Sequence, residues 1–276
     1  MAIKRILVAL GGSEYMDVAM REACEIALRH DCILHGLAIN DETLADPLQA
    51  TPMGGGAAAK ELRETREASI ESGMHEAIQR FEEICKAQGV QGYPIEAHGS
   101  ATEVIPEAMK LMDLGIFGIR KVFDYGAVNH ADDFLAQVVK ETRRPILAIP
   151  APAQPIERVL VAYDGSLPSA DALRSFAVLH AFNPKTIRVV TCRDGDVDAD
   201  SQVEEAIDYL ESHGYSAEGR SLDGPASSEI LSHAEAFKAD LIVHGVVGRS
   251  GFMKLLVGDT AATLLAKSHI PLYLHY

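Results

Sequence analysis

The sequence has no excess of basic residues and no long apolar run. Lys and Arg number 25 against 40 Asp and Glu, which gives the 276-residue chain a formal net charge of −15. Nucleic acids and anionic membrane surfaces need a basic surface that releases their counterions. No segment approaches the roughly 20 apolar residues of a membrane span, and the short apolar run near the N-terminus lacks the cleavage site of a signal peptide. The sequence therefore predicts neither nucleic acid nor membrane as a partner.

Cysteine is scarce, and metal-binding patterns are missing. The four cysteines show no C-x-x-C spacing, which predicts reduced structural thiols and a cytoplasmic location. The 11 histidines form no H-E-x-x-H motif and no paired ligand spacing. We therefore predict no metal site.

The common catalytic and nucleotide motifs are also missing. There is no G-x-x-x-x-G-K-[ST] loop, and no G-x-G-x-x-G follows either first strand, which disfavours a phosphate-loop NTPase and an NAD enzyme. Ser13 and Ser166 follow glycine but lie outside any G-x-S-x-G motif. Both serines are predicted to cap helices.

The chain contains an internal repeat. The stretch RILVALGGS from Arg5 matches RVLVAYDGS from Arg158, at an offset of 153 residues. Further along, DLGIFG from Asp113 matches DLIVHG from Asp240, in the same order. The chain is therefore one unit present twice.

The seam between the repeats is rich in proline. Pro150, Pro152 and Pro155 cannot join a helix or a central strand, so this stretch predicts a short stiff linker. The expected domains are residues 1–150 and 156–276.

Strand and helix patterns alternate in the second half. The expected strands are Arg158–Tyr163, Thr186–Cys192, Ser216–Ser221, Leu241–Gly245 and Leu272–His275. The expected helices cover about 167–182, 200–213, 225–238 and 258–268. Several strands lack an apolar–polar alternation, which is typical of strands buried on both faces of a parallel sheet. The predicted fold class is α/β, with two tandem doubly wound, Rossmann-like domains that each hold a five-stranded, mainly parallel sheet.

The first half carries an additional stretch of about 25 residues, around 41–69. It includes a Gly/Ala-rich segment and leads into a lengthened helix, which we expect over 60–88.

Ligands of a doubly wound sheet bind beyond the carboxyl ends of its strands. Asp164 follows the first strand of the second half, and Gly245 and Gly248 follow the fourth. The carboxylate can accept hydrogen bonds from a ribose or an adenine amino group, and the glycines let the backbone approach a ligand. The helix that opens near Gly258 offers free N–H groups to phosphate.

These residues resemble the universal stress proteins, in a tandem form that covers nearly the whole chain. The spacing Gly245-x₂-Gly248-x₉-Gly258 and the loop at Arg249 are similar to the signature of the ATP-binding subgroup. The resemblance implies a doubly wound sheet, ATP or a related adenine nucleotide, dimerisation, and a role in stress survival. It also implies a nucleotide site formed by Ala162, Asp164, Cys192, His244, Gly245, Gly248, Arg249, Gly258, Asp259 and Thr260.

Asp259 departs from the family signature, which has Ser or Thr at this position. A carboxylate cannot donate to a phosphate oxygen, and it repels an anion at close range. One interpretation makes Asp259 only the N-cap of the following helix. In the others, the hydroxyl of Thr260 contacts the phosphate, a divalent cation such as Mg²⁺ bridges Asp259 to it, or ADP or AMP relieves the repulsion.

The first half has lost most of the signature. Gly11 stands where the second half has Asp164, and Lys121 replaces the second motif glycine. The third glycine position falls near Ala131 or Asp132. We therefore predict a degenerate first domain and at most one nucleotide site per chain; an anion site at Arg120 and Lys121 is the alternative.

The main functional hypothesis is a stress-response protein that binds an adenine nucleotide in its second domain and acts as a switch or sensor for unidentified protein partners. No obvious general base for fast hydrolysis is present, so binding is favoured over catalysis. The alternatives are a nucleotide-free scaffold and a slow ATPase. In this family the last strands of two domains pair, which implies an internal pseudo-dimer ending at Ile149 and His275, and a homodimer of the whole chain is a further expectation.

Overall fold

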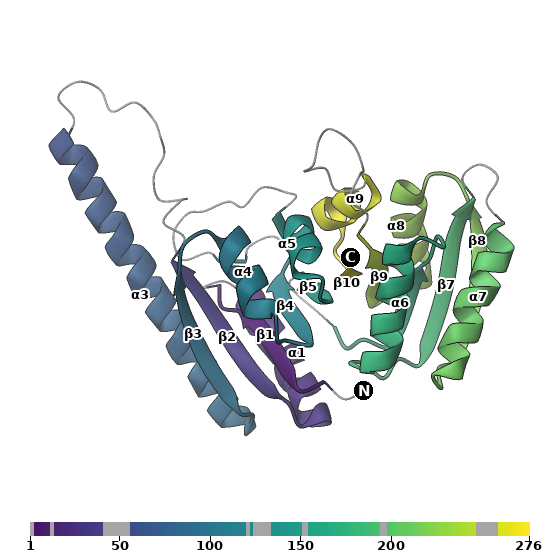
Figure 1. The fold of residues 1–276 in the computed structure, drawn as a ribbon, viewed down its shortest axis with the longest axis horizontal. Helices are drawn as coiled ribbons and strands as arrows, with labels where there is room; N and C mark the ends of the chain where they lie inside the picture. Colours follow the sequence, from purple (N-terminus) through teal and green to yellow (C-terminus); the bar gives the residue numbers. More distant parts are fainter. Residues whose placement is uncertain are drawn as a thin grey trace.

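The computed structural model describes residues 3–11, 14–40, 56–119, 122–123, 134–150, 154–193, 198–246 and 259–276 (Figure 1). The first half comprises β1 (Arg5–Ala9), α1 (Glu14–His30), β2 (Ile33–Asn40), α3 (Gly56–Gln88), β3 (Gly92–His98), α4 (Ala101–Met109), β4 (Leu114–Gly118), α5 (Phe134–Thr142) and β5 (Ile146–Ile149). The second half comprises β6 (Arg158–Ala162), α6 (Leu167–Leu179), β7 (Thr186–Arg193), α7 (Ala199–Ser212), β8 (Ala217–Asp223), α8 (Ala226–Phe237), β9 (Leu241–Gly245), α9 (Asp259–Lys267) and β10 (Leu272–His275).

All ten strands belong to one sheet, in the order β3-β2-β1-β4-β5-β10-β9-β6-β7-β8. Within each half every described pair is parallel, whereas β5 and β10 pair antiparallel, with Leu147 opposite Tyr273. The predicted α/β fold with two doubly wound halves is confirmed, and so is the pairing of the last strands. Because the two halves run in opposite directions at this junction, their strands end at opposite edges of the sheet.

Helices cover both faces of the sheet. One apolar cluster joins the strands to α1, α3, α6 and α7, and includes Met20, Phe81, Phe176 and Leu210. A second cluster joins the other face to α4, α5, α8 and α9. In strands enclosed in this way, the backbone amides and carbonyls are hydrogen-bonded in the ladder, and side chains on both faces are buried in an apolar cluster. This burial on both faces explains their continuous apolar sequences.

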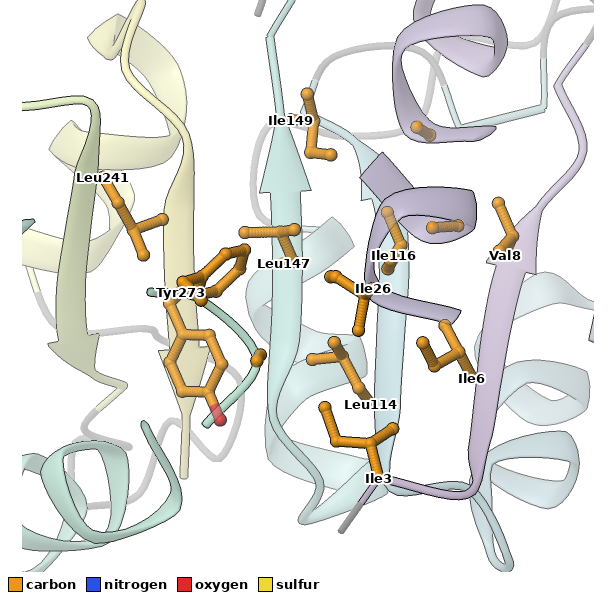
Figure 2. Close-up of a cluster of buried hydrophobic side chains, with 14 of the residues drawn as sticks. Ile3, Ile6, Val8, Ile26, Leu114, Ile116, Leu147, Ile149, Leu241 and Tyr273 are labelled. Atoms are coloured by element: carbon orange, nitrogen blue, oxygen red, sulfur yellow. The ribbon is translucent and has the colours of Figure 1, made fainter. Parts of the chain in front are cut away.

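The two halves share a core at the β5–β10 junction. Figure 2 shows Tyr273 of β10 beside Leu147 of β5, with Ile26 of α1 in the same cluster. Tyr273 is fully buried, and its ring meets that of Phe176 edge-on at 5.9 Å between centroids. Burial of this size makes the junction part of the folded core rather than a loose contact.

The repeated aspartates have the same structural role in both halves. Asp113 accepts hydrogen bonds from the backbone amides of Lys4 and Arg5, at 2.8 and 3.0 Å. Asp240 accepts the equivalent bond from the amide of Arg158 at 2.8 Å. Each carboxylate therefore fixes the chain as it enters the first strand of its half.

The long helix α3 starts earlier than predicted, at Gly56 rather than residue 60, and has 33 residues. Among the α3 side chains that the structure describes, burial begins at Ile70, and the amino-terminal part of the helix projects beyond the sheet (Figure 1). Conversely, α6 ends at Leu179 instead of continuing to residue 182. His180 adopts a left-handed conformation with φ of 49°, which terminates the helix.

Candidate functional site

The carboxyl ends of β6, β7 and β9 place most of the predicted residues along one edge of the sheet. Ala162 ends β6 and lies opposite His244 of β9 in the ladder. Cys192 lies near the end of β7, and Asp164 follows β6. The structure therefore brings Ala162, Asp164, Cys192, His244 and Gly245 to a common edge, as expected for parallel strands.

The Asp164 carboxylate is held in an ordered turn before α6. The Ser166 amide donates to Oδ1 of Asp164 at 3.0 Å, and the Asp164 amide donates to the Ser169 hydroxyl at 3.4 Å. Partial burial opposes ionisation, but hydrogen bonds with Ser166 and Ser169 outweigh it and lower the pKa of Asp164 below its usual value. Asp164 is therefore ionised at neutral pH and remains exposed at the sheet edge.

Ser166 caps helix α6, as predicted from the sequence. Its hydroxyl accepts from the Ser169 amide at 3.3 Å. Ser13, the corresponding serine of the first half, lies outside the described residues.

We expect Ser166→Ala to lower the free energy of unfolding by about 0.5–2 kcal/mol, because the first turn of α6 loses its side-chain acceptor. Urea denaturation measures this loss. Ser201→Ala, at an exposed position early in α7, is the matched control and should unfold like the native chain. An equal effect of both substitutions would refute the capping role.

His244 carries a buried polar atom at the same edge. Its Nδ1 is shielded from solvent and has no hydrogen-bond partner among the residues that the structure describes. Burial lowers the pKa of His244 to about 4, although the charge of Asp164 opposes this shift. At neutral pH the ring is uncharged, so it can contact a polar ligand atom but adds no positive charge for phosphate.

Gly245 has a packing role that the sequence did not reveal. A Cβ at this position would lie 2.3 Å from the amide nitrogen of Ser169 and 2.6 Å from the carbonyl oxygen of Pro168. The absent side chain thus makes room for the backbone of α6. Glycine at 245 is explained by this contact whether or not a ligand is bound.

Gln202 of α7 is a residue of this edge that sequence reasoning missed. Its Nε2 donates to the carbonyl of Asp164 at 3.1 Å, while its Oε1 is buried without a partner in the described parts of the chain. Gly165, with φ of +73°, lies against the same amide. No motif signals Gln202, because only the packing of α7 on β7 and β8 brings it to the turn that follows β6.

The phosphate end of the predicted site is only partly described. Gly248, Arg249 and Gly258 lie outside the described residues. Helix α9 starts at Asp259, so Asp259 is the first helical residue and not the N-cap, which corrects that interpretation by one position. Thr260, half-buried, occupies the next position.

The equivalent edge of the first half has a different composition. Gly11 is buried after β1, where the second half has Asp164, and Gly118 ends β4. Arg120, Lys121 and residues 131–132 lie outside the described residues. Within the described part, this edge lacks a carboxylate at the position of Asp164.

In the part of the chain that the structure describes, no group of three or more His, Cys, Asp or Glu side chains is placed to hold a metal ion. Nor does any described helix combine the length and the apolar character required to cross a membrane.

The fold and its edge define a tandem, doubly wound α/β protein with a polar site at the ends of the strands of its second half. The family model for the "Universal stress protein family" matches residues 2–114 and 155–274. The chain belongs to the universal stress protein family.

Curated relatives carry the same family name. The chain is 29% identical over 161 residues to universal stress protein Slr1230 of Synechocystis sp., covering 58% of this chain and 56% of that protein. It is 40% identical over 50 residues to universal stress protein MJ0531 of Methanocaldococcus jannaschii, covering 18% and 29%. The matches therefore span about half or less of the length of these relatives.

Solved structures match almost the whole chain. A universal stress protein from Archaeoglobus fulgidus superposes with a TM-score of 0.70 at 16% identity, covering 98% of this chain and 97% of that one. A putative universal stress protein from Pseudomonas aeruginosa gives a TM-score of 0.62 at 19% identity, covering 99% and 93%. At these identities the likeness establishes the fold alone.

Proposed function

We propose that the chain binds an adenine nucleotide, ATP, ADP or AMP, at the carboxyl edge of its second half and acts as a nucleotide-dependent switch in a stress response. The observation that carries this proposal is the pairing of two groups at one edge. Asp164 offers an ionised acceptor, and His244 offers a buried Nδ1 without a described partner. Buried polar atoms are rarely left without a hydrogen-bond partner. A polar ligand atom at this edge would supply the partner of His244 Nδ1 and would lie beside the Asp164 carboxylate.

In this proposal the adenosine and the phosphates of the nucleotide contact different parts of the chain. A carboxylate accepts up to about four hydrogen bonds, so Asp164 can receive a ribose hydroxyl or an adenine amino group in addition to its bonds within the turn. His244 is neutral and cannot balance phosphate charge. The phosphates are therefore assigned to the amino end of α9, with Thr260, and to Arg249.

The resulting switch needs no catalytic step. Arg249 and the glycines at 248 and 258 belong to the segment that connects β9 to α9, and a bound phosphate would select one arrangement of that segment. Partner proteins would then distinguish the loaded chain from the empty one. For ATP the proposal includes a divalent cation such as Mg²⁺, which Asp259 would hold and which would offset the charge of the phosphates.

Asp164→Asn tests the adenosine end of the site. The amide keeps the shape of the side chain but loses the charge and half of the acceptor capacity, so we expect nucleotide affinity to fall about 10- to 100-fold. The measurement is mild purification, denaturation and mass analysis of the released nucleotide, with calorimetric titration of the same samples.

Asp208→Asn is the control for Asp164→Asn, since Asp208 is an exposed aspartate of α7. It should retain as much nucleotide as the native chain. If Asp164→Asn also retains it with unchanged affinity, Asp164 has no part in binding and the proposed site is wrong.

A further inference from the structure

The side-chain amide of Gln202 joins helix α7 to the turn that carries Asp164. Its Nε2 donates to the Asp164 carbonyl at 3.1 Å. The reverse orientation of the amide would place its oxygen against that carbonyl oxygen, so that two acceptors would face each other. The orientation of the Gln202 amide is therefore fixed, and Oε1 is the atom that remains for another partner.

Oε1 of Gln202 is a buried acceptor. It is shielded from solvent and receives no hydrogen bond from the parts of the chain that the structure describes. A buried amide oxygen without a donor is costly, and native proteins contain few such atoms. Nδ1 of His244, at the same edge of the sheet, is buried in the same way. Two such atoms at one edge point to a polar ligand that supplies their partners.

The first turn of α7 is anchored where β7 and β8 end. Arg193, the last residue of β7, forms ion pairs with Asp200 of α7 at 3.1 Å and with Asp223, the last residue of β8, at 3.0 Å. Gln202 follows Asp200 by two residues and reaches the turn after β6. These contacts place its amide at the carboxyl edge of the sheet, beside Asp164.

Gly165 leaves room for the amide of Gln202. A Cβ at position 165 would lie 2.5 Å from Nε2 of Gln202, and the φ of +73° at this position also favours glycine. The turn after β6 thus fits closely around the amide. Because the fit limits rotation of the side chain, Oε1 keeps one direction as well as one identity.

The two acceptors of this edge suit different donors. The carboxylate of Asp164 is ionised and offers up to about four lone pairs, which suits the neighbouring hydroxyls of a ribose. The amide oxygen of Gln202 is neutral and already committed in direction, which suits a single N–H group. Adenine presents such a group as its 6-amino substituent, whereas guanine and hypoxanthine carry a carbonyl oxygen at that position.

We propose that Gln202 selects the base of the nucleotide: its Oε1 accepts a hydrogen bond from the 6-amino group of adenine, while Asp164 accepts from the ribose. The inference rests on the proposed nucleotide site and states which purine that site accepts. A 6-oxopurine would bring a second acceptor against Oε1 and leave both oxygens without a donor, which rejects it. Gln202 is therefore a specificity-determining residue.

The experiment compares ATP with ITP by calorimetric titration of the full chain in the presence of magnesium. The comparison is repeated with ADP and IDP and with AMP and IMP, because the members of each pair share the ribose and the phosphates. We expect the native chain to bind the adenine member of a pair about 10- to 100-fold more tightly, since the oxo group leaves Oε1 without a donor.

Gln202→Met removes the amide but retains an unbranched side chain, and it should bring the ratio of the two affinities close to one. This ratio is the decisive measurement. Loss of the bond to the Asp164 carbonyl could shift the turn, but a shifted turn weakens both members of a pair by the same factor and leaves the ratio unchanged. Gln79→Met, at an exposed position of α3, is the matched control and should keep the native ratio.

The failure of this inference can be told apart from the failure of the nucleotide site. Equal binding of both members of every pair by the native chain would overturn base selection alone, and so would a Gln202→Met variant that keeps the native ratio. Absence of binding for all six nucleotides would refute the site and base selection together. Circular dichroism shows whether Gln202→Met folds, and Gln202→Ala, with a good helix former, takes its place if it does not.

Discussion

Tyr273→Ala is expected to lower the free energy of unfolding by about 3–5 kcal/mol, the range for large aromatic side chains removed from a core. Tyr273 is fully buried in β10, pairs with Leu147 across the junction, and packs edge-on against Phe176. Removing its ring leaves a cavity where the two halves of the sheet join. The surrounding strands are held by ladders on both sides, so the cavity cannot collapse completely.

Urea denaturation of native and variant chains measures this loss. Tyr273→Phe retains the ring and should cost at most about 1.5 kcal/mol. Tyr93→Ala removes a half-exposed tyrosine from the edge strand β3 and serves as the surface control. A Tyr273→Ala variant as stable as the Tyr93→Ala variant would mean that the junction contributes little to the folded core.

Gly245→Val should also destabilise the chain, at the upper end of the roughly 1–3 kcal/mol typical of overpacking. The new Cβ would meet backbone atoms of Pro168 and Ser169, at 2.3 to 2.6 Å. Backbone cannot rotate away as a side chain can, so α6 would have to move from β9. Since α6 begins directly after the turn that holds Asp164, the candidate site would be displaced as well.

The control for Gly245→Val is Gly214→Val. Gly214 has φ of +84° and open space where a Cβ would be placed, so this variant carries backbone strain without a clash. Gly214→Val should lower the free energy of unfolding, measured by the same urea denaturation, less than Gly245→Val does. If Gly245→Val unfolds at the same urea concentration as the native chain, the close packing of α6 is wrong. Loss of nucleotide in the Gly245 variant alone would not demonstrate a ligand contact.

The strands of the second half could be predicted from their short apolar runs, whereas their order in the sheet was not predicted. The predicted strands Leu241–Gly245 and Leu272–His275 have the observed bounds, since buried parallel strands are short apolar runs between polar turns. The end of α6 could not be predicted, because the residue in the left-handed conformation that ends the helix is His180 and not a glycine.

The candidate site was predictable only where a motif marks it. Asp164 and His244 follow from their places at strand ends, whereas the place of Gln202 depends on how α7 packs on β7 and β8. The reason for glycine at 245 is likewise a contact with a distant segment, the first turn of α6. Sequence spacing identifies such positions but does not distinguish a ligand from protein backbone as the neighbour.

The most direct test of the central claim is the stoichiometry of nucleotide binding by the full native chain. Calorimetric titration with ATP, ADP and AMP, each with magnesium, should give saturable binding of at least one of them at one nucleotide per chain. Two nucleotides per chain would contradict the assignment of the site to the second half alone. Absence of binding for all three would refute nucleotide binding and favour a nucleotide-free scaffold.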